Sequence, residues 1–167
     1  MPRLISVDPG TTQSSYVLTD GGGGCVIQHG TLPNAAVEQL LKNTDVEHFA
    51  VEMISSYGAP VGEEVFETCL WIGRFIGAFN GPHTKIKRHE IKMHLCHTMK
   101  GINDSAIRQR LIDLYGGKEK AIGNKKSPGP LYGFHGDQWA ALAVANVWWD
   151  RQAFVDEPLE PNNADAT

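Results

Sequence analysis

The order of strand-like and helix-like segments constrains the fold of this chain more than any other feature. Three short β-branched or apolar segments come first, separated by an Asp-Pro-Gly turn and a four-glycine turn, so we expect an antiparallel meander. Helix-like and strand-like segments then alternate. The expected strands are 4–8, 15–18, 25–27, 49–53 and 84–87, and the expected helices are 34–42, 61–79, a short one from 88, one from 103 or 104 to 115, and 137–151. This order predicts an α/β fold, a mixed sheet with helices on both faces.

The chain length predicts one compact domain, which we place at 1–152. Residues 153–167 are expected to form an acidic, disordered tail. The segment 117–135 is rich in Gly, Pro and Lys and is expected to be a mobile loop. The chain shows no membrane-spanning run and no signal peptide, and its 3 cysteines have no disulfide-like spacing. These features favour a cytoplasmic protein.

The helix expected at 61–79 has two apolar faces. One face is a stripe at helical spacing, made by Val65, Cys69, Ile72, Ile76 and Phe79. The second, flatter face is made by Phe66, Leu70, Gly73 and Gly77. Because one face would cover the sheet, the other is available for a second subunit, and we expect a two-fold homodimer through this helix.

Three acidic residues stand where elements begin or end. Asp8 ends the first expected strand, Glu52 lies near the end of the fourth, and Asp137 opens the last helix, whose Ala-rich start permits close packing on the sheet. If the first and fourth strands pair, these carboxylates converge, and only divalent cations or protonation make such a cluster tolerable. Oxygen ligands favour Mg²⁺ or Mn²⁺, and two such ions are a standard device for phosphodiester cleavage.

Charge is strongly segregated along the chain. Residues 84–126 carry eleven basic and four acidic side chains, whereas the net charge of the whole chain is −4. A basic segment flanked by acidic ones is typical of a protein that binds phosphates on one face and cations on another. A solvated, lysine-rich surface gives the same pattern.

Four motifs together resemble the RuvC family of Holliday junction resolvases, of which the phage and prophage branch is most similar. They are Ser6–Thr11, Phe49–Glu52, Leu70–Arg74 with Gly77, and Asp137 followed by Ala141–Ala143, in the family's order over about residues 3–150. The resemblance implies an RNase H-like fold with a mixed five-stranded sheet, three antiparallel strands followed by two parallel ones. It also implies a homodimer that makes Mg²⁺-dependent paired nicks in four-way DNA junctions, in the cytoplasm of a bacterium or a phage-infected host. Such an enzyme would serve DNA recombination and repair.

In the resemblance, Asp8, Glu52 and Asp137 match the metal-binding acids, for what are expected to be two Mg²⁺ ions per site, with Mn²⁺ able to substitute. Three positions depart from the family pattern: Ala140 stands where a second acid usually precedes the Ala-Leu-Ala run, Asp104 stands where a basic residue is usual, and Ser55 replaces a junction-wedging phenylalanine. We expect His135 to take part in catalysis, as a ligand of the second ion or by orienting the attacking water.

The DNA-binding candidates are basic residues of the 84–126 block and one aromatic residue near the wedge position. They are Lys85, Lys87, Arg88, Lys92, Lys100, Arg108, Lys125, Lys126 and Tyr57. A zinc site made of His89, His94, Cys96 and His97 is disfavoured by their spacing.

Two other functions remain open at this point. The Val7–Thr12 motif also resembles the first phosphate motif of actin-like and chaperone-like ATPases, although those enzymes clasp the nucleotide between two domains. The missing acid at Ala140 leaves room for a protein that binds junctions without cleaving them.

Overall fold

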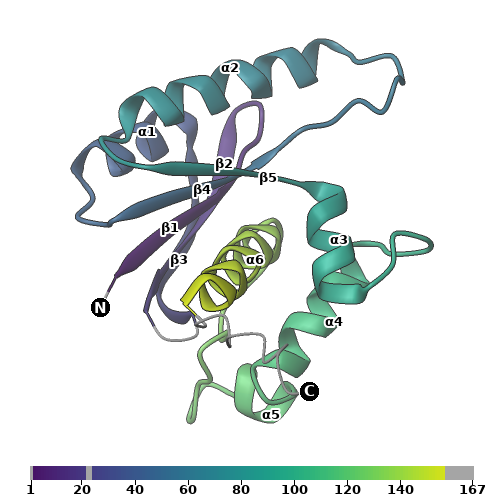
Figure 1. Ribbon diagram of the computed structural model, residues 1–167. Helices are drawn as coiled ribbons and strands as arrows, with labels where there is room; N and C mark the ends of the chain where they lie inside the picture. The colour runs from purple at the N-terminus through teal and green to yellow at the C-terminus, as the bar shows by residue number, and fades with distance from the viewer. Residues whose placement is uncertain (1, 22–23, 157–167) are drawn as a thin grey trace, which may run out of the picture.

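The computed structural model of the chain describes residues 2–21 and 24–156 and contains a five-stranded sheet (Figure 1). The strand order is β3-β2-β1-β4-β5. Strands β1, β2 and β3 pair antiparallel, and β4 pairs parallel with both β1 and β5, as the sequence predicted. The strands are β1 (Arg3–Asp8), β2 (Gln13–Asp20), β3 (Cys25–Pro33), β4 (His48–Met53) and β5 (His83–Lys87).

Helices cover both faces of this sheet (Figure 1). On one face α1 and α2 pack against Ile5, Phe49 and Val51. On the other face α6 runs along the sheet, with α3 and α4 beside it. The helices are α1 (Asn34–Asn43), α2 (Glu63–Ala78), α3 (Arg88–Cys96), α4 (Asp104–Leu114), α5 (Lys118–Ala121) and α6 (Gln138–Asp156). None of the described helices is long and apolar enough to cross a membrane.

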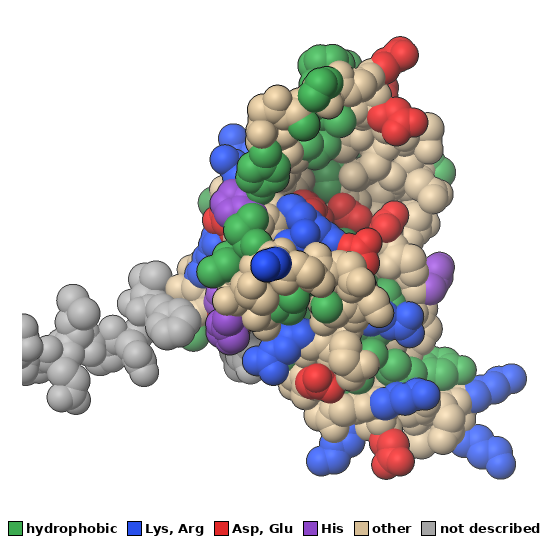
Figure 2. Space-filling model, turned by 90° about the vertical axis from the view of Figure 1, so that its right-hand side faces the viewer, with side chains coloured by type: hydrophobic (Ala, Val, Ile, Leu, Met, Phe, Trp, Pro, Cys, Tyr) green, Lys and Arg blue, Asp and Glu red, His purple; other side chains and the backbone are tan. Residues whose placement is uncertain are grey.

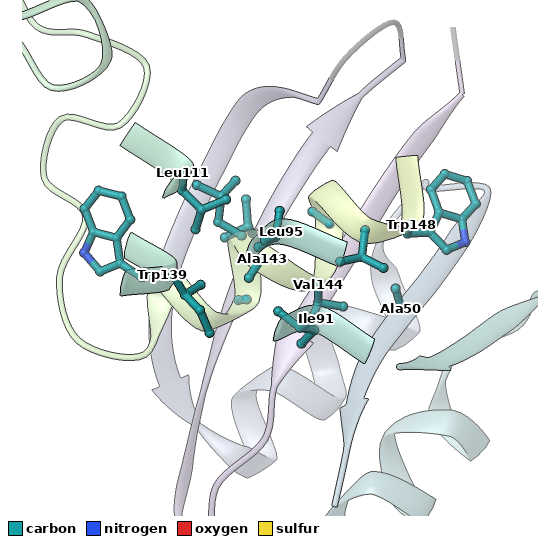
Figure 3. Close-up of a cluster of buried hydrophobic side chains, with 14 of the residues drawn as sticks. Ala50, Ile91, Leu95, Leu111, Trp139, Ala143, Val144 and Trp148 are labelled. Atoms are coloured by element: carbon teal, nitrogen blue, oxygen red, sulfur yellow. The ribbon is translucent and has the colours of Figure 1, made fainter. Parts of the chain in front are cut away.

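The core on the α6 face explains why this helix lies so close to the sheet (Figure 3). Ala141, Ala143 and Ala145 are fully buried, and their small side chains leave little distance between helix and strands. The hydroxyl of Ser6 in β1 donates a hydrogen bond of 2.8 Å to the carbonyl of Ala141. The first turns of α6 are therefore fixed directly to the central strand.

The expectation of a mobile loop at 117–135 is wrong. The segment contains α5, a β-bridge between Gly123 and Pro128, and backbone hydrogen bonds back to α5, such as Leu131 N–H to Ala121 O at 2.7 Å. Leu131 and Phe134 are buried in the core. They stand among glycines and prolines, which favour a loop, so the sequence pattern does not reveal that they are core residues.

Two expected boundaries differ from the structure by five residues or more. Strand β3 continues to Pro33 instead of ending at residue 27, because it is an edge strand whose polar residues break the apolar pattern. Helix α6 continues to Asp156, five residues beyond the expected end. The expected disordered tail therefore begins in this helix at 153–156, and its remainder, 157–167, lies outside the described residues.

Candidate active site

The register of the two central strands places Asp8 beside Glu52. Strand β1 pairs parallel with β4, with Val7 opposite Val51, and Asp8 and Glu52 are the next residues on the two strands. Side chains alternate between the faces of a sheet. Val7 and Val51 point to the α1–α2 face, so both acids point to the face that α6 covers.

Asp137 reaches the same place from the N-terminal end of α6. It directly precedes the helix, and the next residue, Gln138, is 2% exposed. The Gln138 amide bonds to His29 Nδ1 at 2.7 Å and to Thr31 Oγ1 at 3.3 Å, both on β3. Together with the bond between Ser6 and Ala141, these contacts fix the position of Asp137.

A network of hydrogen bonds holds the turn that follows Asp8. The Gly10 N–H donates to Ser14 Oγ, the Ser14 hydroxyl donates to Asn34 Oδ1, and Asn34 Nδ2 donates to the carbonyl of Gly10. A side chain at Gly10 would place its Cβ 2.3 Å from the Gln13 carbonyl oxygen, which is too close. The turn therefore requires glycine and keeps the end of β1 rigid.

The three acids line one pocket of about 160 Å³. In the face of the molecule that Figure 2 shows, acidic side chains meet a basic one in a central hollow, with further basic side chains below it. The pocket residues come from β1, β4, the start of α3, the start of α4 and the start of α6. They are Asp8, Glu52, Arg88, Asp104, Ile107, Gly136, Asp137, Trp139 and Ala140.

Burial and mutual repulsion perturb two of these carboxyl groups. Burial, followed by the charges of Glu52 and Asp137, raises the pKa of Asp8 to about 9. Burial also raises the pKa of Glu52, although Arg88 opposes that shift. The carboxyl groups of Asp8 and Glu52 lie within hydrogen-bonding reach of each other. Without a cation, Asp8 therefore keeps its proton at neutral pH.

Arg88 and Asp104 belong to this pocket in a way that sequence reasoning missed. Arg88 Nη1 lies 3.7 Å from Glu52 Oε1, and Arg88 Nη2 pairs with Asp104 Oδ1. The sequence marked Arg88 only as one of many basic residues and Asp104 only as a departure from a pattern. An acid at position 104, where a basic residue is usual, was the one feature of the sequence that could have indicated a positively charged partner for Asp104.

The donor atoms of the pocket fit a hard divalent cation in type and charge. Asp8, Glu52 and Asp137 offer only oxygen, which suits Mg²⁺ or Mn²⁺. Burial raises the pKa of Asp8 most, and a cation would remove the carboxylate repulsion that raises it further. In the described part of the chain, no set of three or more His, Cys, Asp and Glu side chains is arranged to hold a metal ion. The guanidinium of Arg88 provides the nearby positive charge instead.

His135 lies apart from the pocket lining. Its side chain is exposed, and its Nδ1 lies 3.1 Å from the carbonyl oxygen of Gly133. Ala140 lines the pocket and offers no ligand atom. The expected catalytic role of His135 therefore stays a prediction.

The other DNA-binding candidates are spread over β5, α3, the loop between α3 and α4, α4 and the segment after α5. Lys85, Lys87, Lys100, Arg108, Lys125 and Lys126 are exposed, and Lys92 is half-buried. Arg108 lies over the ring of Trp139, 4.9 Å from its centroid, and so stands next to the pocket. Lys125 and Lys126 occupy a tight turn closed by hydrogen bonds between Asn124 and Ser127.

Tyr57 lies in the loop between β4 and α2 and is 67% exposed. Its backbone has a φ of 51°, an uncommon left-handed conformation for a residue other than glycine. The Tyr57 hydroxyl and His89 Nδ1 are 2.6 Å apart. This bond holds an exposed aromatic ring on the side of the molecule where α3 begins.

Comparisons with known proteins give matches among solved structures. No family model and no curated protein matches the chain by sequence. A Thermus thermophilus RuvC structure has a TM-score of 0.65 and 16% identity, over 94% of this chain and 99% of that chain. A T. thermophilus RuvC in complex with a Holliday junction substrate has a TM-score of 0.67 and 15% identity, over 95% and 100% of the two chains. The expected fold is therefore confirmed, and the chain has the RuvC-like, RNase H-like fold.

Proposed function

We propose that this protein is a metal-dependent endonuclease that resolves four-way DNA junctions by paired nicks. The observation that carries the proposal is the pocket in which Asp8, Glu52 and Asp137 meet from two adjacent strands and one helix. The match to a RuvC structure that contains a Holliday junction substrate supports the choice of DNA.

Asp8, Glu52 and Asp137 would hold Mg²⁺ or Mn²⁺, as one ion or two. A cation bound there would polarise the phosphate and lower the pKa of an attacking water. The residues themselves contribute rigidity, because two lie on paired strands and the third precedes a helix bonded to β1. The hydrolysis adds the water oxygen to phosphorus while the bond to a sugar oxygen breaks, and that oxygen takes up a proton.

The surface around the pocket suits a branched nucleic acid. Basic side chains of α3 and α4 lie beside the pocket, because Arg88 lines it and Arg108 lies over the ring of Trp139, which also lines it. Figure 2 shows further basic side chains around the hollow. Lys85 and Lys87 of β5 point instead to the α1–α2 face, because they pair with Val51 and Met53. Contacts of lysine and arginine to phosphates supply affinity without reading sequence. The exposed ring of Tyr57 offers a surface on which an unpaired base at the junction could stack.

The function is tested with an end-labelled four-way junction and a linear duplex of matched sequence. We expect symmetric nicks in the junction with Mg²⁺, no nicks with EDTA, and far slower cleavage of the duplex. Binding without cleavage in Mg²⁺ and in Mn²⁺ would show a junction-binding protein instead. Mg²⁺-dependent hydrolysis of ATP without nuclease activity would point to the ATPase alternative.

The exposed face of α2 carries the proposal of a homodimer. Phe66 and Leu70 are 61% and 65% exposed, and the positions of Gly73 and Gly77 have open space beside them. We expect F66E/L70E to be monomeric by light scattering at micromolar concentration and to lose coordination of the two nicks. Glu67→Gln, on the same helix, is the control and should remain a dimer. A wild-type monomer at that concentration would contradict the proposal.

His135 gives a further prediction. If His135 orients the attacking water or ligates a second ion, His135→Ala should slow single-turnover cleavage by about 10- to 100-fold. Adding Ala140→Asp to that variant should restore part of the rate, because it supplies an oxygen ligand that lines the pocket. Cleavage by His135→Ala at the wild-type rate would remove the histidine from the mechanism.

A further inference from the structure

Arg88 differs from the other basic residues because its guanidinium reaches into the pocket of carboxylates. It is the first residue of α3, directly after β5, and β5 is the parallel neighbour of the strand that carries Glu52. Its side chain is 30% exposed, and it contacts both Glu52 and Asp104. The positive charge therefore stands beside the position where a phosphate would meet the proposed metal.

The two partners of Arg88 have different environments. Glu52 is 13% exposed and is one of the proposed metal ligands, whereas Asp104 is 89% exposed at the start of α4. A cation bound to Glu52 would compete with the guanidinium, but it leaves the pair of Arg88 with Asp104 intact. Asp104 can thus keep Arg88 at the mouth of the pocket when Glu52 is engaged.

If a cation engages Glu52, the side of the Arg88 guanidinium that faced Glu52 becomes available for a phosphate group. The guanidinium has five N–H donors in a planar fork, stays protonated at any working pH, and matches the spacing of two phosphate oxygens. Fixed donors aimed at developing negative charge are worth more in a partly buried pocket than in open solvent. Arg88 would therefore act on the phosphate being cleaved, unlike lysines on the exposed surface.

We propose that Arg88 exchanges Glu52 for the scissile phosphate when metal and DNA bind, and that Asp104 is the positioning residue that holds its guanidinium there. The proposal rests on the proposed nuclease function. Arg88 stabilises charge on the non-bridging oxygens and neither gains nor loses a proton in the step. In the protein without DNA, the same side chain competes with the metal for Glu52.

If this exchange occurs, replacing Arg88 should raise the affinity for Mn²⁺ but lower the rate of junction cleavage. Arg88→Gln should bind Mn²⁺ more tightly than the wild type in the absence of DNA, by about 3- to 10-fold, because a competing charge is gone. It should also slow single-turnover junction cleavage by about 100- to 1000-fold at saturating protein and metal. Arg88→Lys should recover only part of the rate, because an ammonium lacks the planar fork.

The Asp104 variants separate positioning from metal binding. Asp104→Asn should slow cleavage by about tenfold without weakening Mn²⁺ affinity, and Asp104→Glu should recover part of the rate. Arg151→Gln breaks an Arg–Glu pair of 2.9 Å outside the pocket and should change neither measurement. Weaker Mn²⁺ binding in Asp104→Asn would make Asp104 a metal ligand and would overturn its positioning role.

The role of Arg88 would be overturned if Arg88→Gln cleaved the junction at the wild-type rate in a single turnover. It would also be overturned if a slower rate of this variant returned to the wild-type rate at saturating protein. Calorimetric titration with Mn²⁺ gives a readout that does not depend on cleavage. Absence of cleavage by the wild type would instead contradict the proposed function, so the two failures are distinguishable.

Discussion

Changing any one of the three pocket acids to its amide will lower the single-turnover rate of junction cleavage by about 1000-fold or more. Asp8→Asn, Glu52→Gln and Asp137→Asn each remove a charged oxygen ligand from the pocket while keeping the shape of the side chain. Junction affinity should stay within about threefold of the wild type, because phosphate contacts come from the basic residues.

The measurement pairs denaturing gels for cleavage with gel-shift titrations in Ca²⁺ for binding. Asp113→Asn is the matched control, since Asp113 is an exposed acid of α4 that bonds to Gln109 outside the pocket. It should cleave at the wild-type rate. An amide variant of Asp8, Glu52 or Asp137 that keeps near-normal activity in Mg²⁺ would remove that residue from the metal site.

Metal affinity will rise steeply with pH, by up to about tenfold per pH unit below pH 9. The cause is Asp8, whose pKa is raised to about 9, first by burial and then by the charges of Glu52 and Asp137. A metal must displace the proton from this carboxyl group, and displacement becomes easier as the pH approaches the pKa. Calorimetric titration with Mn²⁺ from pH 6.0 to 8.5 under anaerobic buffer checks the slope and the release of protons.

The same group sets a pH dependence of stability in the metal-free protein. The pKa of Asp8 is higher in the folded protein than in the unfolded chain, so its protonated carboxyl group contributes to the free energy of unfolding. That contribution is fully present below the unfolded pKa of 3.8 and is lost progressively as the pH rises toward about 9. Asp8→Asn should therefore stabilise the metal-free protein at pH 8, by about 1–2 kcal/mol. Thermal unfolding in EDTA tests this, and a lower melting temperature of Asp8→Asn at pH 8 would contradict it.

Much of the fold could be predicted because its signals are local. The turn after Asp8, the apolar stripe of α2 and the alanines of α6 each determine an element from neighbouring residues. The convergence of Asp8 and Glu52 also followed from pairing two strands in parallel. The extension of β3 over residues 28–33 and the packed segment 117–135 were missed. Pairing with β2 and burial of Leu131 and Phe134 in the core hold these residues, and neither leaves a periodic apolar pattern in the sequence.

The candidate site was predicted only in part for the same reason. The acids mark the ends of elements, and their positions are visible in sequence. The pairing of Arg88 with Asp104 joins residues that are 16 positions apart on two helices, and it depends on how α3 and α4 pack. Neither the bond between Tyr57 and His89 nor the exposed position of His135 follows from spacing along the chain.

The most direct test of the account is to locate the metal itself. Crystals of the protein soaked in Mn²⁺, with data collected at the manganese absorption edge, would show where the ions bind. We expect anomalous density between the carboxylates of Asp8, Glu52 and Asp137, and none at the same place in Glu52→Gln. Mn²⁺ bound only elsewhere, with Arg88 still paired to Glu52 at saturating metal, would contradict the central claim.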